Sequence, residues 1–174
     1  EVGIEPVLDM PNVGKNLHDH VNAVVHFDMA STESLTSILR ADQVVLHALR
    51  YQLTRTGPIA NFPSSSVAFI RVMEASERPD IELIINPIWQ EAQIWFPGFR
   101  RESHRFSARC AVLHPRSRGY VWLRSSDPAD KPRILWNLFK DSHDLATLRE
   151  GIKAIRDIFR QSPLREMGPS EFTP

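Results

Sequence analysis

The chain has 174 residues, in which 21 lysines and arginines balance 21 aspartates and glutamates, and it contains a single cysteine, Cys110. This length predicts one domain with a substantial core, and the balanced charge disfavours nucleic acid or anionic lipid as a partner. One cysteine excludes an internal disulfide and a cysteine-based zinc site, which slightly favours a cytoplasmic location, and no apolar run is long enough to predict a membrane span or a signal segment.

The segment DMPNVGKNLHDH, residues 9–20, concentrates residue types that often carry chemistry. It is not a Walker-type phosphate loop, because the first glycine and the final serine or threonine of that motif are missing. His18 and His20 would share one face of an extended segment, but no third ligand is near in sequence, so we expect no metal site. Asp19 and His20 would point to opposite faces of a strand, which favours a role in fixing the loop over an acid/base pair.

The next elements are strands, interrupted by one helix. Residues 21–29 are apolar and β-branched, and they predict a strand. From Asp42, apolar residues recur at three- and four-residue steps and predict a helix that Gly57 and Pro58 end. Further strands are predicted at residues 66–73, 78–87, 106–113 and 119–126. A hairpin through HPRSRG is the expected connection between the last two.

Three other stretches contain residue types found in active or binding sites. Ser64 to Ser66 lack the G-x-S-x-G elbow of a hydrolase. The two arginines of HPRSRG can hold an anion, but a hairpin turn is the favoured interpretation. Residues 88–105 predict a long loop whose aromatic side chains either line an apolar ligand pocket or pack on the sheet. These aromatic residues are Trp89, Trp95, Phe96 and Phe99.

The clearest predicted element is a helix near the end of the chain. One apolar stripe at helical spacing is formed by Leu145, Leu148, Ile152, Ile155 and Phe159. Asp141 is the predicted cap of this helix and Pro163 marks its end. The final MGPSEFTP predicts a loop, and both ends of the chain resemble cuts within something longer. Strands joined as hairpins between two helices predict an α+β fold, mostly antiparallel sheet with flanking helices.

No G-x-G-x-x-G motif is present, so the chain lacks the usual means of binding a dinucleotide. Four segments nevertheless resemble, in the same order, segments of the glucose-methanol-choline (GMC) family of FAD-dependent oxidoreductases. They are DMPNVGKNLHDH, LRYQLTRTGPIANFPSSSVAFIRV, RPDIELIINP and the run from VLHPRSRGYVWLRSSDP into the last helix. Together these segments cover nearly the whole chain.

The resemblance implies the fold of the substrate-binding domain of GMC oxidoreductases. Residues 1–20 would then be a connecting segment from a missing FAD-binding half. Residues 21–174 would form a substrate-binding-type domain that lacks its catalytic C-terminal part. FAD is the implied cofactor, and the family's catalytic histidine would lie beyond Pro174, so no catalytic residue is assigned within this chain. The residues implied to fix a loop near the flavin are Gly14, Asn16, Asp19 and His20.

For the whole protein, the resemblance implies oxidation of an alcohol to an aldehyde with hydride transfer to the flavin. This chain would contribute the substrate pocket and its entrance, and would be inactive alone. Ser65 stands where choline-oxidising relatives carry a glutamate, which argues against choline, and the aromatic loop favours an apolar or aromatic alcohol. The pocket candidates are Asn61, Phe62, Ser65, Trp89, Trp95 and Phe96. The alternatives are a stand-alone ligand-binding module of the same fold without redox activity, and a purely structural docking domain.

Overall fold

The computed structural model describes residues 2–61, 66–99 and 102–173, and within these ranges it confirms an α+β fold. The helices are α1 (Ala41–Thr54), α2 (Ser142–Phe159) and the short 3-10 helices η1 (Leu35–Leu39), η2 (Pro58–Asn61) and η3 (Leu164–Met167). The larger sheet has the strand order β3 (Ser66–Ile70), β4 (Ile81–Asn86), β5 (Arg105–Val112), β2 (Asn22–Met29) and β8 (Pro169–Thr173). The smaller sheet has the order β1 (Lys15–Leu17), β6 (Gly119–Trp122) and β7 (Arg133–Leu135). All of these strand pairs are antiparallel.

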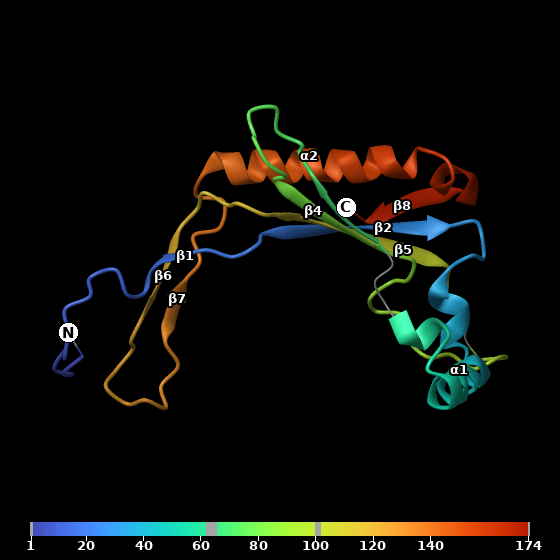
Figure 1. Cartoon of the computed structure of the whole chain (residues 1–174), viewed down its shortest axis with the longest axis horizontal. Coiled ribbons are helices and arrows are strands. Elements are labelled where there is room, and N and C mark those ends of the chain that lie inside the picture. Colours follow the sequence, from blue (N-terminus) through green and yellow to red (C-terminus); the bar gives the residue numbers. More distant parts are fainter. Residues whose placement is uncertain (1, 62–65, 100–101, 174) are drawn as a thin grey trace.

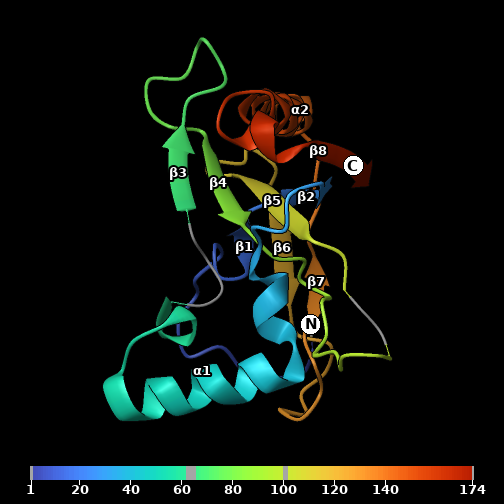
Figure 2. The same ribbon diagram turned by 90° about the vertical axis from the view of Figure 1, so that its right-hand side faces the viewer.

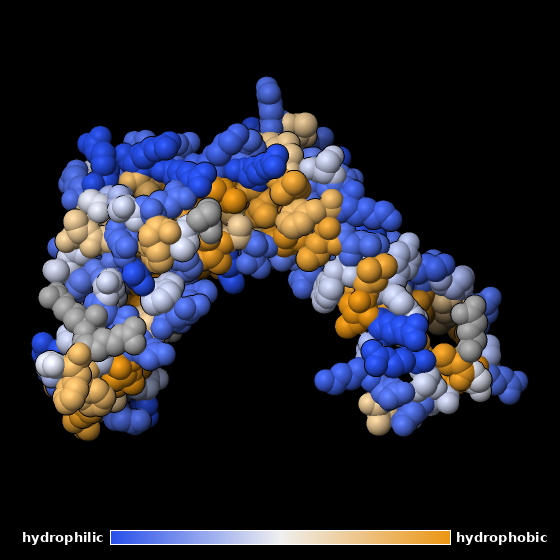
Figure 3. Space-filling view, turned by 180° about the vertical axis from the view of Figure 1, so that it is seen from behind, coloured by the Kyte–Doolittle hydropathy of each residue, from blue (hydrophilic) through white to orange (hydrophobic). Residues whose placement is uncertain are grey.

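The chain has the shape of an arch (Figure 1). The larger sheet and α2 form its top, with α2 on the outer face of the sheet (Figure 2). One limb contains the smaller sheet and the N-terminal segment, and the other contains η1 and α1. Among the described residues, no helix covers the inner face of the larger sheet, which borders a hollow between the two limbs; the space-filling view shows this hollow from behind (Figure 3).

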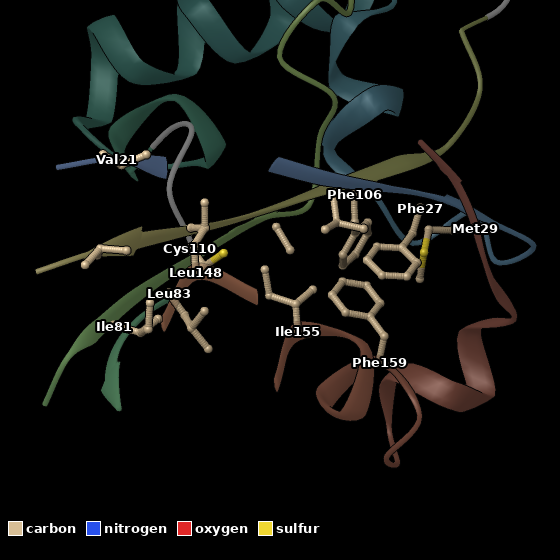
Figure 4. Close-up of a cluster of buried hydrophobic side chains, with 13 residues drawn as sticks. Val21, Phe27, Met29, Ile81, Leu83, Phe106, Cys110, Leu148, Ile155 and Phe159 are labelled. Atoms are coloured by element: carbon tan, nitrogen blue, oxygen red, sulfur yellow. The ribbon is translucent and has the colours of Figure 1, made fainter. Parts of the chain in front are cut away.

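The hydrophobic core lies between α2 and the outer face of the larger sheet (Figure 4). Side chains alternate along a strand, so one set from β2 and the matching set from β5 point toward α2. From α2, Ile155 is fully buried and Phe159 stacks on Phe27 at a centroid distance of 3.8 Å. The buried residues of this core include Val25, Phe27, Met29, Phe106, Ala108, Cys110, Val112, Leu148, Ile155 and Phe159. The apolar stripe predicted for the last helix is therefore the stripe that makes the core.

Close approach between α2 and the sheet depends on Gly151. A Cβ atom at this position would lie 3.0 Å from Ile81 Cδ1 and 3.2 Å from Cys110 Cβ, which is tighter than ordinary van der Waals contact. Burial also raises the pKa of the Cys110 thiol, so this side chain behaves as a small apolar residue in the core. The predicted N-cap is confirmed, because the Asp141 carboxylate accepts the backbone N–H of His143 at 2.8 Å.

Two predictions about the strands are wrong. β5 and β6 do not form a hairpin, since β5 pairs with β2 and β4 whereas β6 pairs with β1 and β7. The amides of Arg116 and Ser117 donate to the buried Asp144 of α2, and this contact directs the connection away from β5. The final stretch is not a loop, because β8 extends the sheet along the free edge of β2. Pro169 is the first residue of β8, a strand position where a missing N–H is tolerated.

Candidate functional site

The inner face of the larger sheet is the candidate site, because it faces the hollow of the arch (Figure 1). Along β2 and β5, the side chains that alternate with the core residues lie on this inner face, and most of them are polar or charged. Near the edge of the same face, β3 presents Val67 and Phe69, which are 52% and 59% exposed. The inner face therefore offers polar groups beside apolar area.

At the centre of this face, β2 and β5 bring together a histidine and a serine. His26 and Ser107 are opposite one another in the strand register, and His26 Nδ1 lies 2.9 Å from Ser107 Oγ. Burial lowers the pKa of His26, and the positive charge of Arg105 lowers it further, against an opposing effect from Glu91. The imidazole is therefore neutral at pH 7, and it can donate through one ring nitrogen and accept through the other.

Beside this pair, the guanidinium of Arg105 is enclosed by aromatic rings and one carboxylate. Its Nε donates to Asp28 Oδ1 at 2.7 Å, and its central carbon lies 4.7 Å from the Trp89 ring centroid and 4.4 Å from that of Phe172. Phe172 also stacks on His26 at 5.7 Å between centroids. Strands β2, β5 and β8 thus hold one connected cluster together with Trp89 of the loop. Asp28 binds Arg105, so it does not orient the His26–Ser107 pair as a third catalytic group would.

The predicted loop residues near the flavin lie at the start of the N-terminal limb. Gly14 has a φ of +80°, and a Cβ there would lie 2.0 Å from the Val121 carbonyl oxygen, so glycine is required for contact with β6. Asn16 also has a positive φ, 60°, at an irregular position in the pairing of β1 with β6. Asp19 Oδ1 accepts the backbone N–H of His20 at 2.8 Å. These contacts fix the loop, and the side chains of Asn16 and His20 are exposed.

The predicted pocket residues lie in different surroundings. Trp89 belongs to the cluster around Arg105. Trp95 lies against the other limb, where its Nε1 donates to the Thr36 carbonyl at 3.3 Å, and it borders a cavity of about 460 Å³. Phe96 is 60% exposed. Phe62, Ser65 and the Asn61 side chain lie outside the described part of the chain, so their predicted roles stay predictions.

The inner-face residues that make the hydrogen bonds and ring contacts described above were not among the predicted site residues. They are His26, Asp28, Arg105, Ser107 and Phe172. A signal for the residues of β2 and β5 exists in the sequence, because polar residues alternate with apolar ones along 25–29 and again along 105–110. That alternation indicates a face that is not packed in the core, although it does not show which strands lie side by side.

Within the described ranges, no three side chains of His, Cys, Asp or Glu gather so that they could hold a metal ion. In the same ranges, no helix combines the length and the apolar character needed to cross a membrane.

Residues 115–174 match the family model described as GMC oxidoreductase. Glucose dehydrogenase (FAD, quinone) of Drosophila pseudoobscura pseudoobscura is 33% identical over 97% of this chain and 27% of its own length. Oxygen-dependent choline dehydrogenase of Burkholderia cenocepacia is 33% identical over 100% of this chain and 30% of its own length. The chain thus spans less than a third of the length of these curated relatives.

Solved structures show the same fold at low sequence identity. A formate oxidase matches 98% of this chain and 34% of its own chain with a TM-score of 0.82 and 23% identity. A fungal aryl-alcohol oxidase matches 99% of this chain and 36% of its own with a TM-score of 0.73 and 17% identity. These likenesses extend over both limbs and the top of the arch.

Proposed function

Since the chain belongs to the GMC oxidoreductase family, we propose that it forms the substrate-facing part of an FAD-dependent oxidoreductase that converts an alcohol to an aldehyde. The observation that carries this proposal is the inner face of the larger sheet. It is left uncovered by α2 and presents the half-buried His26, which bonds the buried Ser107, beside apolar side chains. Concave surfaces that are mostly apolar, with a few convergent polar groups, are typical of small-molecule sites.

We propose residues 1–20 as the connecting segment and residues 21–174 as a substrate-binding-type domain that docks on an FAD-binding half. The accessible surface supports this, since it amounts to 11851 Å². A compact monomer of 19.9 kDa exposes roughly 8,700 Å². Many exposed large apolar side chains lie on the limbs, as with Leu49 of α1, which is 56% exposed. A second body of protein within the arch would remove this area from water.

The described residues offer a surface that can contact a flavin ring. Val67 and Phe69 of β3 and Phe172 of β8 supply apolar area at the two edges of the inner face, and the exposed Asn16, Asp19 and His20 supply polar groups on the N-terminal limb. No glycine-rich dinucleotide loop is present in the sequence, so the FAD-binding half would hold the pyrophosphate. When bound, FAD supplies the acceptor for the hydride that leaves the alcohol carbon.

In this proposal, His26 binds the alcohol oxygen, and the buried Ser107 fixes the orientation of the imidazole. With Nδ1 bonded to Ser107, the other nitrogen of the neutral imidazole is left to bond the alcohol hydroxyl. The hydroxyl proton passes to a base, and we propose for this role the histidine that the family resemblance places beyond Pro174. Loss of the proton and of the hydride leaves the aldehyde. The isolated chain would lack both the base and the acceptor and would be inactive.

We propose an apolar or aromatic alcohol as the substrate. The loop after β4 supports this, because Ile94, Phe96 and Phe99 are 56%, 60% and 93% exposed and can form an apolar entrance. The faces of Trp89 and Phe172 are occupied by the guanidinium of Arg105, so these rings are not free to hold a quaternary ammonium group. The glucose and choline named for the curated relatives are therefore the comparison substrates for this proposal.

The test uses the full-length protein that carries this chain. Benzyl alcohol, hexanol, choline and glucose are mixed anaerobically with the enzyme, and loss of the visible flavin absorption is followed. We expect benzyl alcohol or hexanol to reduce the flavin fastest. Ser107→Ala should raise KM for the alcohol about tenfold, because the hydrogen bond that orients His26 is lost, whereas Lys153→Gln on the outer surface of α2 should leave KM unchanged. Equal KM values for the two variants would contradict the assigned role of the inner face.

The alternative, a stand-alone ligand-binding module, would be supported by saturable binding of an apolar alcohol to the purified chain in the absence of FAD, whereas the visible spectrum of the chain tests the proposed boundary. After FAD is added and the excess removed, we expect no flavin bands. Retained bands would contradict the proposed boundary at residue 20, because the chain would then hold FAD without a second half.

A further inference from the structure

A second cavity lies away from the inner face, beside the start of α2. It has a volume of about 710 Å³ and is bounded by the β3–β4 connection, the β5–β6 connection and the first turns of α2. The β3–β4 connection rises above α2 in Figure 1, on the side of the sheet opposite the hollow. The basic side chains around this cavity are His18, Arg78, His114, Arg116, Arg118 and His143.

Two of the arginines are available for a ligand. Among the described residues, the guanidinium groups of Arg78 and Arg116 have no hydrogen-bond or ion-pair partner, and both residues are exposed. Arg118 is held in place, since its Nη1 donates to the carbonyls of Pro115 and Ser117 at 2.6 and 3.0 Å. A guanidinium carries five N–H donors, so the remaining donors of Arg118 are not engaged by these two contacts.

The carboxylates near the cavity mainly accept hydrogen bonds from the backbone of the connections that form its walls. Asp80 accepts the amides of Val72 and Met73 at 2.8 and 3.0 Å, which fixes the β3–β4 connection. The fully buried Asp144 accepts the amides of Arg116 and Ser117 at 2.7 and 2.9 Å, which fixes the β5–β6 connection. Both walls are therefore positioned before a ligand arrives, and Glu77 is the remaining acid in the lining.

We propose that this cavity binds a phosphoryl group, as inorganic phosphate or as the phosphate of a small organic ester. Arginine presents parallel N–H groups that match phosphate oxygens, and three arginines from two connections converge on the cavity. The volume lies within the range of small-molecule sites, so it leaves room for an organic part beside the phosphate. The two arginines of HPRSRG thus take the anion-binding role that was the less favoured interpretation of that motif. This proposal is independent of the redox reaction and of the inner face.

The test is calorimetric titration of the purified full-length protein with inorganic phosphate and with glycerol phosphate at constant ionic strength. We expect saturable binding of at least one of them, with sulfate as a competitor and chloride without effect. Arg116→Gln and Arg78→Gln should each weaken binding about tenfold, the factor that corresponds to about 1.4 kcal/mol. The control is Arg149→Gln, which removes the same charge from an exposed position of α2 outside the lining.

Tighter binding of glycerol phosphate would support an organic ester, and equal or weaker binding would support inorganic phosphate. The proposal is overturned if neither compound binds at up to about 10 mM, a concentration that corresponds to negligible affinity. It is also overturned if Arg149→Gln weakens binding as much as Arg116→Gln, because the effect would then be one of general charge. Alcohol oxidation is not a readout of this experiment, so the two proposals can fail separately.

Discussion

The two α-helices have similar sequence patterns and opposite surroundings. Both α1 and α2 carry apolar residues at helical spacing, an aspartate in the first turn and a stop near proline. Leu148 of α2 is 6% exposed and belongs to the core, whereas Leu49 of α1 is 56% exposed, and none of the residues in α1 is buried. The comparison teaches that an amphipathic pattern encodes a surface suited to burial and does not encode the partner that buries it.

The largest expected effect is a difference in stability between a substitution in the apolar face of α2 and the same substitution in the apolar face of α1. Leu148→Ala should lower the free energy of unfolding by about 3 kcal/mol, because it leaves a cavity beneath α2. The same substitution at Leu49 should change it by less than about 1 kcal/mol, since that side chain is half exposed already. Urea unfolding of the purified protein measures both. Equal losses would show that the face of α1 is covered in solution and would remove the contrast.

A second prediction concerns the aspartates of the two first turns. Burial raises the pKa of Asp144, but hydrogen bonds from Ser117 and the amide of Arg116 outweigh this and hold it below its ordinary value. Asp144→Asn should cost about 2 to 3 kcal/mol at pH 7, since it disrupts two charge-assisted hydrogen bonds. The control Asp42→Asn should have a much smaller effect. A bond to Arg40 lowers the pKa of Asp42 to about 2, but this ion pair lies in water.

The pH dependence of the Asp144 contribution has a definite sign. Its folded-state pKa is lowered, so the stabilisation is fully present above the pKa of the unfolded chain, about 4. It is lost as the pH falls from there through the folded-state pKa. The difference in unfolding free energy between the wild type and Asp144→Asn should therefore shrink below about pH 4. A difference that stays constant from about pH 4 down to about pH 2 would contradict the assignment, because the carboxyl of the unfolded chain becomes protonated over this range.

A third prediction tests whether the proposed FAD-binding half contacts the apolar face of α1. In the full-length protein, Leu49→Gln should weaken retention of FAD and lower the melting temperature by a few degrees, roughly the effect of 1 kcal/mol. The reason is that a polar side chain would be placed in the proposed contact with the FAD-binding half. Flavin content after gel filtration and thermal unfolding measure this. Unchanged values for Leu49→Gln would show that α1 faces water in the full-length protein as well.

The smallest effect is expected on the outer surface of α2. Lys153 bonds Glu150 at 2.7 Å, but the two side chains are 63% and 40% exposed. Lys153→Gln should change the unfolding free energy by less than about 0.5 kcal/mol, because exposed ion pairs contribute little. Thermal unfolding at low and high salt checks this. A larger loss would indicate that this surface, unlike that of α1, has an unrecognised partner.

Local sequence signals predicted most of the elements and failed on their pairing. The strand at 21–29, the helix from Asp42 and the capped final helix are confirmed. The predicted hairpin between β5 and β6 is wrong, because the connection between these strands is bound to Asp144. Ser117, which makes one of these bonds, is 27 residues away from Asp144 in the sequence. The strand β8 was missed, because its pairing with β2 spans most of the chain and leaves no local signal in PSEFT.

For the candidate site too, local features could be predicted from the sequence, whereas contacts between strands could not. Trp89 was predicted as a pocket residue because it is an aromatic residue on a loop; in the structure it contacts Arg105, and its role in a pocket stays a prediction. His26 and Ser107 were not found, because they become neighbours only through the register of β2 and β5. Their separation of 81 positions hides the pair from any motif search.

By itself, the sequence determined the local conformations, the GMC resemblance and the loop built around Gly14, since each depends on residues close together in the chain. The tertiary structure alone decided which face of the sheet is core and which faces the hollow, and which arginines converge beside α2. The physical reason is that periodicity fixes which side chains share a face. Strand register and helix packing, which depend on contacts far apart in sequence, fix what that face meets.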